Sequence, residues 1–201
     1  LTATLTRMAC VITAALSVRQ IQQYADTWSD LSAPIQVSIG ATGDSAEVMK
    51  RLGDISRITY TSLEATAESF ANNAFTLKAL GKSTEEQLNY TEALNNALVI
   101  SGAKGNDFAL VQNALGRSMA EGAVKGDDLN LVLNYGSRVA ESLAAELGVN
   151  VTQLRSLAKE GKITGDVIYS ALTNRMEELR KEAESMPATI GDAFTLILNA
   201  I

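Results

Sequence analysis

The chain has 201 residues, of which 46% are hydrophobic and 20% are charged, a balance that excludes a disordered protein. Its net charge of −6 disfavours general affinity for nucleic acid or acidic membranes, because both require a positive field. The single cysteine, Cys10, permits no internal disulfide, and the lack of histidine excludes serine–histidine triads and histidine-based metal sites.

The distribution of prolines and aromatic residues predicts the fold class. Pro34 and Pro187 are the only prolines, and aromatic residues make up 5% of the chain. Proline-free stretches suit helices, whereas large sheets need runs of β-branched and aromatic residues. We predict an all-α fold, a compact domain of about eight to ten short helices with a long amphipathic N-terminal helix and no substantial β-sheet.

Residues 1–33 are predicted to form that long helix. The apolar run from Met8 to Val18 is too short to span a bilayer, so we expect no membrane span in this segment. We expect the apolar stripe of this helix to pack on this chain or on a neighbouring copy, and membrane contact is the alternative. Its residues, spaced by three and four, are Val11, Ala14, Val18, Ile21, Ala25 and Trp28.

Residues 34–43 are predicted to be extended and then to turn. Pro34 is expected to end the long helix, and Ile35–Ile39 alternates apolar and polar residues as a short strand does. A helical domain follows over residues 44–186. Within it, residues 61–64 and 83–86 fit capping boxes that start two helices.

One short phrase occurs twice in this domain, at residues 121–133 and 160–172. Each copy is interpreted as a helix end, a buried branched residue (Val124 or Ile163), a second glycine and an aspartate that caps the next helix. Glycine suits such turns because it adopts positive φ without steric cost. The predicted turn and cap residues are Gly122, Gly126, Asp127, Gly161, Gly165 and Asp166.

The end of the chain carries two more predicted features. One helix is expected to run from Ile168 to Leu179, with a solvated charged run at residues 177–182. Residues 187–201 are interpreted as the start of a further helix that is cut short by the end of the sequence.

No stretch predicts a catalytic, cofactor-binding or metal site. Residues 80–83 resemble the end of a phosphate-binding loop, but Thr76 stands where that loop requires glycine. Residues 148–161 have the rhythm of a helix-turn-helix, although Arg155 and Lys159 give little positive charge in an acidic chain. A DNA-binding or regulatory domain is therefore the alternative function.

Taken together, several phrases resemble the N-terminal domain of tail tape measure proteins of long-tailed bacteriophages and prophages. Residues 135–137 depart from that pattern, because a proline is expected in this turn. The phrases, whose order and spacing carry the resemblance, are residues 24–28, 62–67, 98–105, 126–130, 140–144, 147–149, 153–154 and 160–164.

The resemblance implies a structural virion protein without an enzyme activity or cofactor, found in the phage tail and, before assembly, in the host cytoplasm. In such proteins a long helical remainder sets tail length while tube subunits polymerise around it. The implied partners are tube, terminator or tip proteins, assembly chaperones and further copies of the chain, with no specific nucleic acid. Because glycines and caps interrupt this segment about every 10–20 residues, we expect a folded end-piece and not the rod.

Overall fold

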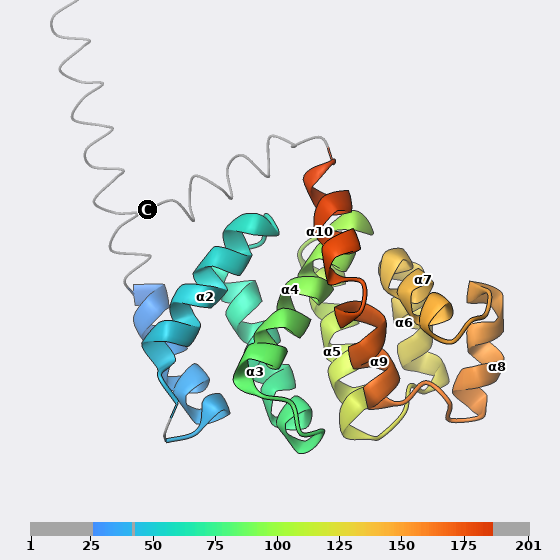
Figure 1. Cartoon of the computed structure of the whole chain (residues 1–201), viewed down its shortest axis with the longest axis horizontal. Coiled ribbons are helices and arrows are strands. Elements are labelled where there is room, and N and C mark those ends of the chain that lie inside the picture. Colours follow the sequence, from blue (N-terminus) through green and yellow to red (C-terminus); the bar gives the residue numbers. More distant parts are fainter. Residues whose placement is uncertain (1–25, 42, 187–201) are drawn as a thin grey trace, which may run out of the picture.

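The computed structural model describes residues 26–41 and 43–186, and within them the protein is all-α (Figure 1). The predicted fold class is confirmed, because the described residues contain no strand and form only an isolated β-bridge. The described helices are a segment at 26–39, α2 (Ser45–Ile58), α3 (Leu63–Ala79), α4 (Thr84–Ile100), α5 (Asn106–Ala120), α6 (Gly126–Tyr135), α7 (Ser137–Glu146), the 3-10 helix η1 (Val151–Gln153), α8 (Leu154–Lys159), α9 (Gly165–Thr173) and α10 (Met176–Glu184).

Local capping residues start several of these helices. Asp44 caps α2 by accepting hydrogen bonds from two backbone N–H groups, and Ser83 and Glu86 form both halves of the capping box predicted for α4. The backbone hydrogen bond from Ser83 holds the pKa of Glu86 below its usual value. At α3 the cap is Ser62 and not Thr61, because the Thr61 hydroxyl is buried and bonds to Thr66.

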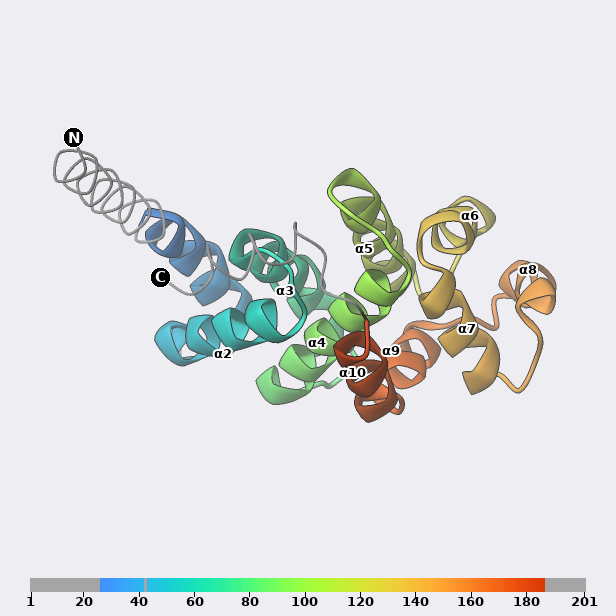
Figure 2. The ribbon, with the colours of Figure 1, turned by 90° about the horizontal axis from the view of Figure 1, so that it is seen from above.

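The helices bury two hydrophobic clusters. The N-terminal cluster joins the segment 26–39 to α2 and α3, and Met49, Leu52 and Phe70 lie at its centre. The C-terminal cluster includes Leu77 of α3 and spans α4 to α10, with α6, α7 and α8 at the end of the molecule farthest from α2 (Figures 1 and 2). Helix α4 lies between them, and residues 90–98 are all buried, which marks it as the central helix of the fold.

A buried polar network connects the two clusters. Asn95 of α4 donates hydrogen bonds to Thr61 (3.3 Å) and to Thr66 of α3 (3.2 Å), and its carbonyl accepts one from Gln112 of α5 (3.4 Å). All four side chains are buried. A buried polar group must find its partner or lose free energy, so this network fixes how α3 pairs with α4 and α5.

The prediction of an extended segment at Ile35–Ile39 is wrong. The chain is helical through Ile39 and turns at Gly40, which has a φ of 87°. Ile35 and Ile39 lie one helical turn apart and are buried in the N-terminal cluster, whereas Val37 is 83% exposed. Burying two isoleucines, at roughly 1.5–3 kcal/mol each, offsets the cost of about 3 kcal/mol for Pro34 inside a helix.

The predicted final helix is also interrupted. The structure breaks it at Asn174 and Arg175, so that α9 and α10 are separate helices. The predicted helices at 1–25 and 187–201 lie outside the described residues. The domain boundary predicted at residue 44 leaves out the segment 26–39, although that segment contributes Ile35 and Ile39 to the core.

The helical register of residues 35–39 predicts effects of very different size for two similar substitutions. Ile35→Ala should lower the free energy of unfolding by about 2 kcal/mol or more, because it leaves a cavity in the N-terminal cluster. Val37→Ala should change it by less than about 0.5 kcal/mol, since that side chain is in solvent. Urea unfolding of both variants measures the contrast, and equal losses would indicate the extended register.

Candidate functional site

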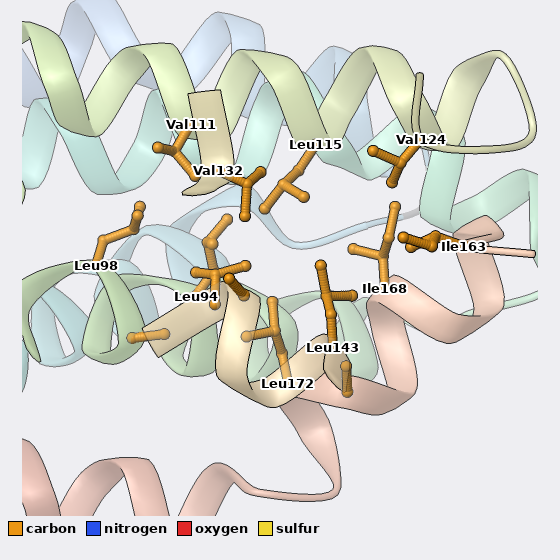
Figure 3. Close-up of a cluster of buried hydrophobic side chains, with 14 of the residues drawn as sticks. Leu94, Leu98, Val111, Leu115, Val124, Val132, Leu143, Ile163, Ile168 and Leu172 are labelled. Atoms are coloured by element: carbon orange, nitrogen blue, oxygen red, sulfur yellow. The ribbon is translucent and has the colours of Figure 1, made fainter. Parts of the chain in front are cut away.

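The two copies of the glycine phrase lie side by side and hydrogen-bond to each other. The N–H of Val124 donates to the carbonyl of Ile163 at 2.8 Å, and Ala123 and Thr164 form an isolated antiparallel bridge. Val124 and Ile163 are 1% and 0% exposed, and they lie beside Ile168 in the C-terminal cluster (Figure 3). The repeated phrase therefore builds one contact that joins the turn before α6 to the turn before α9.

The four glycines of the phrase have two different roles. Gly122 and Gly161 follow the ends of α5 and α8 with φ values of 92° and 68°. Gly126 and Gly165 are instead the first residues of α6 and α9 and lack positive φ, so the expectation of positive φ is wrong for them. A side chain at Gly165 would lie 3.1 Å from the Leu80 methyl Cδ1, whereas Gly126 faces open space.

The prediction that Asp127 and Asp166 cap the following helices is wrong. The N-cap residues are Lys125, which makes no side-chain cap bond, and Thr164, whose hydroxyl accepts from the third N–H of α9 at 3.4 Å. Because the second glycine already belongs to the helix, each aspartate falls inside the first turn. There its negative charge lies near the positive end of the helix, and Asp166 is 3.9 Å from the Lys82 ammonium.

The predicted assembly stripe is only partly described. Val11, Val18, Ile21 and Ala25 lie outside the described residues. Trp28 is half-buried and packs against the N-terminal cluster of its own chain.

Helix α10 is held by ion pairs that the sequence did not predict. The charged residues at 177–182 are exposed or half-buried, as the prediction of a solvated run requires, but several also pair with other helices. Arg138 of α7 donates to Glu178 (2.5 Å) and to Glu182 (2.8 Å). Arg180 donates twice to the nearly buried Glu92 of α4, at 2.8 and 2.6 Å. Burial lowers the pKa of Arg138, but the hydrogen bonds and charges of both glutamates outweigh it and raise this pKa.

Tyr90 is a buried tyrosine at the centre of the fold. It stacks on Tyr169 with ring centroids 6.2 Å apart, and the Lys82 ammonium lies 4.2 Å from the centroid of the Tyr169 ring. The Tyr90 hydroxyl is buried without a hydrogen-bond partner among the described residues. Burial raises the pKa of Tyr90 far above its usual value, because the phenolate would lose its hydration.

A shallow groove of about 410 Å³ lies between the start of α2 and the start of α4. Ile39, Val48 and Leu88 contribute its apolar lining, and an ion pair of 3.3 Å joins Arg51 to Glu85 at its rim. Over the described ranges, no group of three or more possible metal ligands occurs, and no helix is long and apolar enough to cross a membrane.

The helix-turn-helix alternative is not supported. Residues 148–161 form η1 and the six-residue α8, and the Arg155 guanidinium donates a hydrogen bond to Asn130 of α6. A recognition helix must present its side chains to the major groove along several turns. Helix α8 is too short for that role.

The geometry thus defines an all-α structural domain, because its distinctive residues make turns, caps and interhelical ion pairs. Compared with known families, residues 19–201 match the family described as tape measure protein. The chain belongs to the tape measure protein family and is a structural component of a bacteriophage tail, as the resemblance in its sequence implied. No match was found among curated proteins or among solved structures.

The two roles of the glycines predict opposite effects of alanine. Gly161→Ala should lower the free energy of unfolding by about 1 kcal/mol, because a side chain at positive φ is strained even where space is open. The matched change Gly126→Ala should raise it by about 0.5–1 kcal/mol, since α6 gains a better helix former. Thermal unfolding measures both, and destabilisation of equal size would contradict these roles.

Removing the buried hydroxyl of Tyr90 should make the protein more stable. Tyr90→Phe should raise the free energy of unfolding by about 1 kcal/mol, because no buried polar atom is then left unpaired. The raised pKa also means that the folded state keeps its proton when the unfolded state loses it, so stability falls above about pH 10.

In Tyr90→Phe the free energy of unfolding should fall less at alkaline pH than it does in the unsubstituted chain. Urea unfolding from pH 7 to pH 11 measures this difference. Tyr135→Phe, which removes a tyrosine hydroxyl from an exposed position, is the matched control. An unaltered alkaline slope in Tyr90→Phe would contradict the prediction.

Proposed function

We propose that this part of the tape measure protein is a folded end-piece of the tail and not a section of the ruler that sets tail length. A ruler must lengthen in proportion to its number of residues. Among the described residues the longest helices, α3 and α4, contain 17 residues each, which is about 26 Å. The helices lie side by side from α2 to α8, and α9 and α10 then fold back onto α4, so the length of the domain is not proportional to its number of residues (Figure 2). This folding back is the observation that carries the proposal.

The proposed role of the end-piece is to dock on another tail component during assembly. The candidates are tube, terminator or tip proteins, the assembly chaperones and further copies of the chain, first in the host cytoplasm and then in the tail. The contact between the glycine turns supports this role, because it makes the C-terminal half of the domain a preorganised body. The stripe at Val11, Val18, Ile21 and Ala25 remains a proposed docking surface.

A deletion in the phage that encodes the full protein tests the proposal. Removing residues 106–172 in frame would shorten a ruler by about 100 Å if each residue added 1.5 Å. We expect instead that complete tails are lost, because the deletion removes α5 to α9 and with them the C-terminal cluster. Electron microscopy of lysates measures tail number and length. Infectious tails shortened in proportion to the deletion would rule out the end-piece.

A point variant separates folding from length. Leu143→Asp keeps the number of residues and places a charge at a fully buried position of the C-terminal cluster. We expect it to abolish tails as the deletion does. Glu141→Asp, at an exposed position on the same helix, is the matched control and should leave tail number unchanged.

A further inference from the structure

Helix α10 buries little apolar surface for an element packed along the central helix. Leu179 and Ala183 are its buried residues, whereas the neighbouring α9 buries Ile168, Ala171 and Leu172. The views in Figures 1 and 2 agree that α10 lies against α4. Hydrophobic burial therefore contributes less to the docking of α10 than to that of α9.

Arginine–glutamate pairs supply the remaining contacts of α10. Arg180 binds Glu92 on α4, and Arg138 on α7 binds Glu178 and Glu182. At the start of α10, a guanidinium nitrogen of Arg175 lies 2.8 Å from a carboxylate oxygen of Glu146 at the end of α7. These pairs attach α10 to two helices along its whole length.

The surface that α10 covers is apolar where Leu179 packs into the C-terminal cluster and polar beside it. On α4, Glu92 is 2% exposed and accepts hydrogen bonds from Arg180 of α10. Arg138 and Ser142 form the facing part of α7, at 9% and 0% exposure. Water would satisfy Glu92, Arg138 and Ser142 if α10 left, so the polar part of the covered surface also suits solvent.

The contact between the glycine turns shows the opposite chemistry. Val124, Ile163 and Ile168 would all be exposed to water if that contact opened (Figure 3). Interfaces that form and separate are generally more polar than permanent ones. By this criterion the contact between the glycine turns is permanent, whereas the contact of α10 with α4 and α7 is one that can separate.

We propose that α10 is a releasable helix, which undocks from α4 and α7 as a unit while α2 to α9 stay folded. Undocking breaks the pairs of Arg138, Arg175 and Arg180 and exposes the polar surface around Glu92. The equilibrium between docked and undocked α10 is a property of the domain itself and does not depend on which tail component the domain meets.

Native-state hydrogen exchange of the 201-residue chain tests the proposal. Backbone amides of α10 should exchange by local opening, at least about tenfold faster than those of α4. Raising NaCl from about 0.05 M to about 1 M should lower the protection of α10 about threefold more than that of α4, because Glu178 and Glu182 are exposed enough to be screened.

A locked variant distinguishes release from the fraying of any terminal helix. Glu92→Leu combined with Arg180→Met replaces the ion pair by apolar contact, which commonly leaves stability equal or higher. In this variant the α10 amides should approach the protection of α4, and their salt dependence should weaken. The matched control, Arg51→Met with Glu85→Leu, removes an exposed pair far from α10 and should alter neither quantity.

Two outcomes would overturn the proposal. In the unsubstituted chain, α10 and α4 amides could exchange at the same rate at both salt concentrations, which would make α10 part of the global unfolding unit. Alternatively, α10 could exchange faster but without any response to salt or to the locked variant, which would be ordinary fraying. The salt comparison needs no substitution, so the test holds even if the locked variant fails to fold.

Discussion

The contact between the two glycine turns holds the C-terminal half of the domain together. It joins the end of α5 to the start of α9 through the hydrogen bond from Val124 to Ile163, and both side chains enter the C-terminal cluster. The turns can meet closely because Gly122 and Gly161 reverse the chain at positive φ. Because Val124 and Ile163 lie in the two loops themselves, the position of the loop before α9 relative to the loop before α6 depends on this contact.

Other contacts between helices of the domain are made by hydrogen bonds and ion pairs. The network around Asn95 specifies how α3 meets α4 and α5, because each buried amide or hydroxyl must keep its partner. The pairs of Arg138 and Arg180 hold α10 over a surface that water could also satisfy. The domain thus combines three kinds of contact: a permanent apolar contact between the glycine turns, a specific polar network around Asn95, and a separable charged contact at α10. This combination suits a protein that assembles with others.

Membership of the tape measure family places this domain in a phage tail, and the fold restricts what it does there. A ruler requires one continuous extended element, whereas the described part of this chain divides its length among short helices that pack on one another. Short packed helices create a defined surface at the expense of length. The physical character of the domain therefore favours docking over measuring.

The sequence by itself determined the fold class, the start of α4 and the position of the paired turns. These depend on local chemistry: capping at Ser83, the freedom of glycine at Gly122 and Gly161, and the period of apolar residues. The family resemblance was also visible at this level, because it depends on the order of short phrases.

Only the tertiary structure decided the rest. Ile35, Val37 and Ile39 fit a strand as well as a helix, and packing against α2 and α3 selected the helix by burying two of them. A charged run such as residues 177–182 gives no sign of its partners, Arg138 and Glu92, because they come from helices distant in sequence. Local patterns contain no information on such long-range pairs, so the ion pairs of α10 became visible only in the folded chain.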